Sequence, residues 1–319
     1  MLERKESEAL ARQDLESARE YAKRAVPDST KKAYRLDWSD FLSWCLTRGA
    51  QALPASPAAV GAYIAHLAGQ GRKPSTIRRR LASISVAHKA AGQPSPTGDY
   101  GVRKTLDGIE REEGAPQRRV SPVRARNIRK GVQDLGPGVK GSRDRALLLI
   151  GYAGAFRRSE IVSLKASDLR FQEEGVLVTL RRSKTDQKGE GHAKAIGYGS
   201  NLETCPVRSL KAWMQLAGLE GEDPLFPPIK KGGAVMKGQA MTDRAVALIL
   251  KSLAESMGLE KGDVSGHSLR AGFATDGYAA GLPEAVIAEQ TGHRSRQILG
   301  IYRREADRFA VNCSAKVGL

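Results

Sequence analysis

A histidine and an arginine stand three residues apart in "GHSLRAG", directly before an alanine-rich apolar stretch. On a helix this spacing puts the side chains of His267 and Arg270 on one face. Ser265 and Ser268 are candidate caps, so both side chains are expected in the first helical turn. Because free backbone N–H groups and the positive end of the helix dipole favour negative charge there, the stretch predicts an anion site.

Four other short stretches carry side chains that can move protons or hold phosphate. A carboxylate three residues from an arginine, near buried apolar residues, can hold the guanidinium rigidly. Taken singly, each of these features also has a structural explanation. Such a pair can be a salt bridge between helices, a lysine in a hairpin can be a solvated turn residue, and a tyrosine on a helix can be part of the hydrophobic core. The side chains are Arg157 and Glu160 in "FRRSEI", Lys184 in "RRSKTD", His293 in "TGHRS" and Tyr302 in "GIYRRE".

Together these residue types suit attack on a phosphodiester. The reaction needs positive donors for the non-bridging oxygens, and arginines supply them bidentately without a metal ion. It also needs a nucleophile and a proton donor for the leaving oxygen. The sequence has neither an HExxH nor a CxxC motif, so no bound metal is expected.

The charge of the chain favours a polyanionic partner. Its 319 residues include 52 Lys and Arg against 35 Asp and Glu, for a net charge of +17 and a pI near 9.9. A balance of this kind is typical of nucleic-acid-binding proteins. No apolar run is long enough to cross a membrane, and three widely spaced cysteines indicate a reducing compartment. A cytoplasmic protein is therefore expected.

The elements that position these side chains fall into two segments. Residues 1–20 read as a polar tail and 21–111 as a purely helical domain, with stops at glycines. A stretch rich in Gly and Pro, 112–122, reads as a linker. The remainder, 123–319, is mixed. Within it "GVLVTLRRSK" alternates in polarity as a strand does, and "GHAKAIGYG" is its expected hairpin partner.

The order of these motifs, R…K…HxLR…GH…Y, resembles that of the tyrosine recombinases of the phage integrase family, and the helical segment is similar to the core-binding domain of Cre-like members. The resemblance covers about 20–311. It implies a mainly α fold with a small antiparallel β-sheet in the second domain. It also implies a two-domain, C-shaped clamp around DNA, built of a helical, SAM-like core-binding domain and an α+β catalytic domain.

The resemblance also implies a role for each motif residue. Tyr302 would attack the scissile phosphate to give a 3′-phosphotyrosyl bond, and Arg157 and Arg270 would hold the non-bridging oxygens. Lys184 would protonate the leaving 5′-oxygen, with Lys188 and Lys194 as alternatives because hairpin lysines vary in position. His267 would assist the tyrosine and His293 would donate a hydrogen bond to the phosphate. Glu160 would orient the cluster, and no cofactor would be needed.

Two departures from the usual family pattern concern residues beside these motifs. Many members have a second histidine where Ala271 stands, whereas Cre-like proteins have a small apolar residue there, as this chain does. Thr291 replaces a frequent leucine before Gly292. Neither change removes one of the side chains assigned above.

The resemblance also implies which partner the chain binds and how it assembles. The expected partner is double-stranded DNA with a specific recombination site. A homotetramer would bind two duplexes, and the free protein would be monomeric. The segment 306–319 would dock on a neighbouring subunit through Phe309 and Val311. The host would be a prokaryote, phage or plasmid, and the protein would associate with the nucleoid. The polar sides of helices supply the candidate DNA contacts, which are Lys32, Arg78, Arg79, Arg80 and Arg244.

Two alternatives remain open at this point. A type IB topoisomerase uses a similar set of residues but relaxes supercoils without synapsis, and a DNA-binding regulator could keep the fold without the reaction. Neither the target sequence nor the choice among integration, excision and resolution can be read from one sequence.

Overall fold

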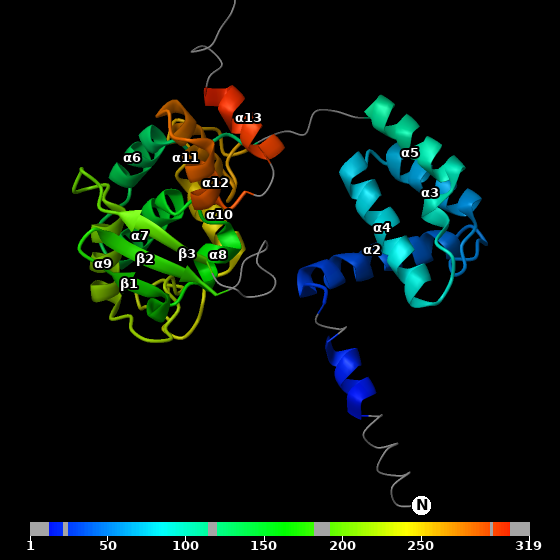
Figure 1. Ribbon diagram of the computed structural model, residues 1–319, viewed down its shortest axis with the longest axis horizontal. Helices are drawn as coiled ribbons and strands as arrows, with labels where there is room; N and C mark the ends of the chain where they lie inside the picture. Colours follow the sequence, from blue (N-terminus) through cyan, green and yellow to red (C-terminus); the bar gives the residue numbers. More distant parts are fainter. Residues whose placement is uncertain (1–12, 22–24, 114–119, 182–191, 294–295, 307–319) are drawn as a thin grey trace, which may run out of the picture. The chain divides into compact units, whose positions relative to one another are not determined.

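The computed structural model describes residues 13–21, 25–113, 120–181, 192–293 and 296–306. The chain divides into two compact units, Met1–Gln117 and Arg118–Leu319 (Figure 1). No helix in the part of the chain described is long and apolar enough to cross a membrane.

The first unit is helical throughout its described residues. Residues 13–21 form a helix that precedes the four packed ones, and a short 3₁₀ turn, Pro96–Gly98, leads into the last. The apolar side chains meet in one core, where Phe41, Tyr63, Ile64 and Ile84 have no exposed surface. The four packed helices are α2 (Asp28–Leu46), α3 (Pro57–Gly69), α4 (Pro74–Ala90) and α5 (Tyr100–Glu113).

A polar network crosses this core and corrects one expectation for α4. Arg80 is 9% exposed, and its guanidinium bonds Asp40 and donates 2.7 Å to the hydroxyl of Tyr63. The prediction that Arg80 shares the solvent-facing side of α4 is therefore wrong. The helix turns about 100° per residue, so the residue before Leu81 faces α2 and α3 rather than water. Arg78 and Arg79 are exposed.

The second unit contains a three-stranded antiparallel sheet in the order β1-β2-β3. The strands are Leu169–Phe171, Gly175–Leu180 and His192–Gly197, and β2 pairs with β3 so that Val178 lies opposite Lys194. The alternating pattern arises because Val176, Val178 and Leu180 are buried on one face. The predicted hairpin is confirmed.

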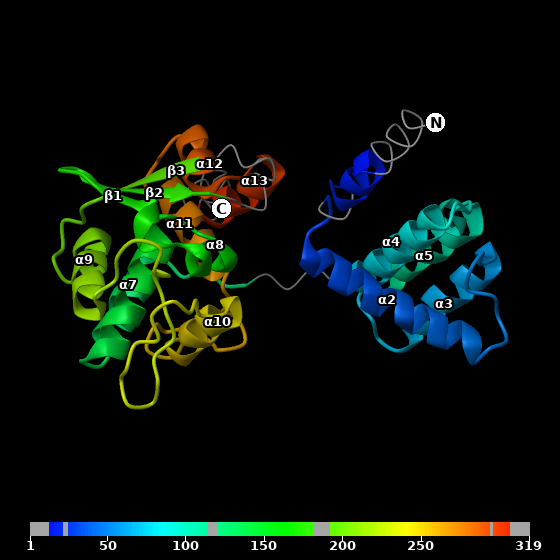
Figure 2. The same ribbon diagram turned by 90° about the horizontal axis from the view of Figure 1, so that it is seen from below.

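The sheet lies at one edge of this unit, with the helices gathered mainly on one side of it (Figure 2). Helix α7 is largely buried and packs against α9 and α11, and α13 packs on α11. Helix α10 ends at Ser252, because beyond this residue the backbone tightens into i→i+3 bonds such as Ala254 N–H to Lys251 O. The helices are α6 (Ala125–Gln133), α7 (Val139–Ala153), α8 (Arg158–Ser163), α9 (Pro206–Ala217), α10 (Asp243–Ser252), α11 (Ser268–Ala279), α12 (Glu284–Thr291) and α13 (Arg296–Ala306).

The chain enters the second unit along α11. The N–H of Ser121 donates to the carbonyl of Asp263 at 2.8 Å, and that of Val123 to Ser268 at 2.9 Å. A Cβ added at Gly272 would lie 1.8 Å from the carbonyl oxygen of Val123, so only glycine allows this approach. The predicted combination of a mainly helical chain with a small antiparallel sheet in its second part is confirmed.

Candidate active site

Arg157 and Glu160 are paired at the start of α8. Arg157 is the N-cap residue, and its backbone N–H donates 2.8 Å to Glu160 Oε2 while its Nη1 lies 2.5 Å from Oε1. Burial pushes the pKa of Glu160 upward, but the N–H and charge of Arg157 outweigh it and hold that pKa below its usual value. The carboxylate therefore stays ionised and holds both the backbone and the guanidinium of Arg157.

The guanidinium of Arg270 is buried, with one donor left over. The residue is 3% exposed; Nη1 donates 3.2 Å to the carbonyl of Ala155, and Nε donates 3.3 Å to His293 Nε2. The Nη2 atom is buried and has no hydrogen-bond partner among the residues that the structure describes. Burial and the charge of Arg157 lower the pKa of Arg270 to about 10, so it remains a cation at neutral pH. An unpartnered cationic donor next to a second arginine favours an anion.

The backbone of Ala155, whose carbonyl accepts the hydrogen bond from Arg270 Nη1, takes a strained conformation. Its φ is +46°, in the left-handed region that residues other than glycine rarely adopt, and the side chain is fully buried. Such residues cost about 1 kcal/mol or more and persist where their surroundings fix them. Here the Arg270 bond fixes the carbonyl.

His293 lies in the turn after α12. Gly292 ends that helix with φ +63°. The imidazole Nδ1 of His293 lies 2.9 Å from Thr291 Oγ1, and this contact holds the ring. Burial, then the charges of Arg270, Arg157, Lys194 and His267, lower the pKa of His293 to about 3. The ring is therefore neutral. Because its Nε2 accepts from Arg270, this arrangement does not provide the phosphate donor that the sequence-based role requires.

Tyr302 is brought to the cluster by α13. Its ring centroid lies 5.7 Å from that of His293, tilted by 37°, and the side chain packs beside Ala274, Ile287 and Leu299. The negative charge of an ionised Tyr302 would stabilise the Arg270 cation. The phenol is thus on the same side of the unit as the two guanidiniums.

His267 is exposed at the start of α11. The helix begins at Ser268 and His267 is its N-cap residue, so it lies one position before the expected first turn. The backbone N–H of His267 donates 3.1 Å to Ser265 Oγ in the turn before the helix, and the N-cap makes no side-chain capping bond, so the prediction that Ser265 or Ser268 caps this helix is wrong.

Lys194 on β3 is buried beneath the cluster. The residue is 3% exposed, and its ammonium donates 2.7 Å to the carbonyl of Gly154 and 2.6 Å to that of Gln290. The same nitrogen lies 4.8 Å from the ring centroid of Phe156. Burial, together with the charges of Arg270 and Arg157, lowers the pKa of Lys194 to about 7 against the opposing charge of Glu160.

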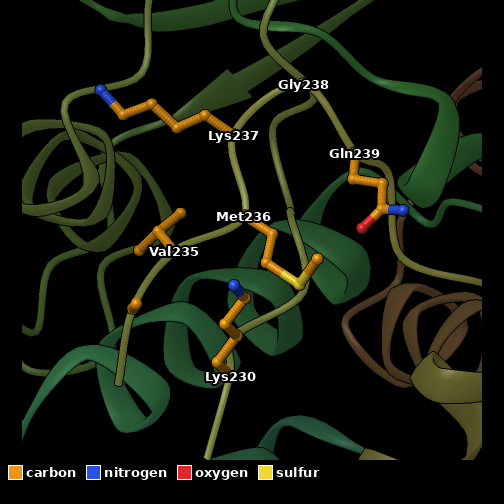
Figure 3. Close-up of a pocket in the computed structure, with 7 residues that line it drawn as sticks. Lys230, Val235, Met236, Lys237, Gly238 and Gln239 are labelled. Atoms are coloured by element: carbon orange, nitrogen blue, oxygen red, sulfur yellow. The ribbon is translucent and has the colours of Figure 1, made fainter. Parts of the chain in front are cut away.

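The remaining expected residues either fall outside the described part of the chain or lie on exposed surfaces. Lys184 and Lys188 fall outside the described residues, as do Phe309 and Val311. Lys32 is exposed on α2 and Arg244 on α10. The hollow in Figure 3 is lined by Lys230 and the residues 234–239, none of which belongs to the cluster, and Lys237 there donates 2.6 Å to the carbonyl of Gly218.

The part of the chain that carries this cluster matches a known protein family. Residues 125–308 match the model of the phage integrase family. The chain belongs to the phage integrase family. The matched range holds the described cluster from Arg157 to Tyr302.

Named members of the phage integrase family match nearly the whole chain. An integrase/recombinase XerD homologue of Selenomonas ruminantium is 38% identical over 300 residues, which is 92% of this chain and 87% of that protein. The Cre recombinase of Escherichia phage P1 is 24% identical over 83% of this chain and 80% of its own length. The prediction of a tyrosine site-specific recombinase is therefore confirmed.

Solved structures of the phage integrase family share the fold. The Tn1549 transposon integrase in complex with transposon right end DNA aligns over 92% of this chain and 98% of its own, with a TM-score of 0.63 and 16% identity. XerH in a post-cleavage complex with difH aligns over 82% and 72%, with a TM-score of 0.59 and 18% identity. At this identity the likeness concerns the fold alone.

Two contacts in the cluster were not anticipated. The sequence singled out Thr291 as a departure from the family pattern, but gave it no role, and it named Lys194 only as an alternative proton donor. The motif "TGH" carries a signal for the first, since a hydroxyl two residues from a histidine can reach its ring. The second depends on strand register and on two distant carbonyls.

Proposed function

We propose that Tyr302 is the nucleophile of this recombinase and attacks a DNA phosphate held between Arg157 and Arg270. The observation that carries the proposal is Arg270 Nη2, a buried cationic donor that has no partner in the described part of the chain. Buried donors are nearly always paired, so this one awaits an acceptor. A phosphodiester oxygen supplies the charge and the lone pairs, and it also relieves the repulsion between the two arginines.

The reaction proceeds by exchange of one phosphate ester for another. The phenol oxygen of Tyr302 forms a bond to phosphorus, the bond to the 5′-oxygen breaks, and that oxygen takes up a proton. The product is a 3′-phosphotyrosyl bond, so the phosphodiester is conserved for rejoining. His267, exposed beside the cluster, assists transfer of the phenolic proton. Losing one oxyanion donor such as Arg270 lowers such rates by roughly 100- to 1,000-fold.

Lys184 is the proposed donor of the proton to the leaving oxygen. The contacts of Lys194 support this choice over that lysine, because its ammonium is buried and donates to two backbone carbonyls. An ammonium held in this way does not extend to a substrate atom. Lys188 remains the alternative on the same hairpin.

DNA and other copies of the chain are the proposed partners. Exposed cations on both units, Lys32, Arg78, Arg79 and Arg244, are proposed to contact the duplex. A homotetramer on two duplexes is proposed, formed from monomers, with 306–319 docked on a neighbour. Deletion of 307–319 should then spare DNA binding and abolish recombination, and full recombination by the truncated protein would contradict the docking role. We place this activity at the nucleoid.

The decisive experiment is recovery of DNA covalently trapped on the protein in cells, followed by sequencing. Wild-type protein should give adducts at one site, and Tyr302→Phe none. Tyr278→Phe is a matched control, because its hydroxyl bonds Glu284 at 3.2 Å, and it should give adducts as wild type does. Adducts in Tyr302→Phe would overturn the assignment. Dispersed adducts with supercoil relaxation and no synapsis would indicate a topoisomerase.

A further inference from the structure

We propose that the hydroxyl of Thr291 fixes which nitrogen of His293 carries the proton, and thereby orients Arg270, which makes Thr291 a positioning residue for strand cleavage. The inference rests on the proposed function, since it concerns the arginine that holds the phosphate.

The direction of the hydrogen bonds begins at α12. Thr291 has no exposed surface, and its Oγ1 lies 2.6 Å from the carbonyl of Ile287. A carbonyl only accepts, so the single hydroxyl proton points there. Toward His293 Nδ1, 2.9 Å away, the hydroxyl oxygen is then the acceptor. Nδ1 therefore carries the ring proton.

The other side of the ring agrees with this direction. Arg270 Nε always bears a proton and lies 3.3 Å from His293 Nε2, so that nitrogen must present its lone pair. The opposite tautomer would set an N–H of the ring against an N–H of the guanidinium. The chain of bonds from Arg270 through His293 and Thr291 to Ile287 can therefore run in one direction only. Burial and the charges of Arg270, Arg157 and Lys194 also keep the ring uncharged.

The consequence falls on the guanidinium. With Nε held by His293 and Nη1 by the carbonyl of Ala155, the plane of the Arg270 side chain is fixed. Nη2 is left as the buried donor that no described residue pairs with. An apolar side chain at 291 would provide no acceptor for Nδ1. The Nδ1–H would then be buried without an acceptor, and this cost offsets the bond that Nε2 accepts from Arg270, so the preference for this tautomer weakens.

The protonation state can be read directly by nuclear magnetic resonance. In full-length protein labelled with ¹⁵N-histidine, long-range proton–nitrogen spectra distinguish the two tautomers, and His293→Gln assigns the signal. His88 is an internal reference, because its Nδ1 lies 2.8 Å from the carbonyl of Ile84 and its Nε2 accepts from the N–H of Ala55 at 2.9 Å. We expect His293 to be in the Nδ1–H form in wild type and in Thr291→Ser, which keeps the hydroxyl. In Thr291→Val it should become mixed, while His88 is unchanged.

The kinetic test uses a nicked suicide duplex carrying the sequence recovered from trapped adducts. Thr291→Val should form the covalent adduct roughly five- to tenfold more slowly, the worth of one neutral hydrogen bond, with duplex affinity unchanged and Thr291→Ser restored. An Nε2–H ring in wild type, an unchanged tautomer in Thr291→Val, or a shifted tautomer without slower cleavage would each overturn the proposal. Adducts that persist in Tyr302→Phe would instead overturn the proposed function, and the spectra would still report on Thr291.

Discussion

The ammonium nitrogen of Lys194 lies 2.6 Å from the carbonyl oxygen of Gln290, three residues before His293. The same nitrogen lies 2.7 Å from the carbonyl oxygen of Gly154, three residues before Arg157. One side chain on β3 thus holds the chain just ahead of two cluster residues that are far apart in sequence. The distance between Arg157 and His293 depends on this buried lysine.

Replacing Lys194 by Met should loosen both attachments while preserving the length of the side chain. Two charge-assisted bonds are lost, so the free energy of unfolding should fall by about 2–4 kcal/mol, with a parallel loss of adduct formation. Lys237→Met is the matched control, because that ammonium also donates 2.6 Å to a carbonyl but is exposed; it should cost roughly 0.5 kcal/mol or less. Denaturant titration compares the two, and equal losses would contradict the bracing role.

The same lysine should make stability depend on pH. Its pKa is about 7 in the folded chain and about 10.4 in an unfolded one, so between these values the unfolded state binds more protons. The free energy of unfolding of the wild type should therefore rise with pH across this window relative to Lys194→Met, by at most about 1.4 kcal/mol per pH unit. Urea titrations at pH 7, 8 and 9 test this, and parallel curves for the two proteins would refute it.

Glu160→Gln should separate positioning from DNA binding. The carboxylate accepts from the backbone N–H and from Nη1 of Arg157, and an amide presents only one oxygen to these two donors. Adduct formation should fall by about 10- to 100-fold, since a hydrogen bond to a charged group is worth about 1.5–3 kcal/mol. Duplex affinity in a gel-shift assay should change little. A large loss of affinity with normal cleavage of bound duplex would contradict the positioning role.

Arg80 and Arg78 should differ in kind, although they stand on the same helix. Arg80→Ala leaves Asp40 and Tyr63 without their buried partner, and should cost about 3 kcal/mol of stability. Arg78→Ala removes an exposed pair with Glu110, which solvent screens, so stability should hardly change. If Arg78 contacts a phosphate, its loss should also lower the slope of log affinity against log salt by about 1. Equal thermal shifts in both variants would contradict this assignment.

Gly272→Ala should displace the chain that enters the second unit. The new Cβ would meet the carbonyl of Val123 at 1.8 Å, and such overpacking typically costs about 1–3 kcal/mol. Gly108→Ala is the control, because nothing lies within 4 Å of its Cβ and the gain in helix propensity should raise stability by about 0.5–1 kcal/mol. Melting curves that shift in the same direction would show that the segment accommodates the methyl group.

The sequence was sufficient where one local pattern decides the structure. Alternation in "GVLVTL" predicted a strand, and the motifs around Arg157, Arg270, His293 and Tyr302 predicted residues that the structure brings into one unit. Arg80 could not be placed, because its burial depends on Asp40 and Tyr63 from two other helices. The contacts of Lys194 depend on carbonyls from α7 and α12, and the tautomer of His293 on the proton of a neighbouring hydroxyl. Periodicity does not encode these distant partners.

The attachment of residues 121–123 to α11 gives the enzyme a mechanical linkage. Ser268 accepts the N–H of Val123 at its carbonyl and stands two positions before Arg270, so residues 121–123 are attached at the start of the helix that carries this arginine. A pull along residues 121–123 would bear first on the start of α11 and would reach the Arg270 guanidinium within a single helical turn.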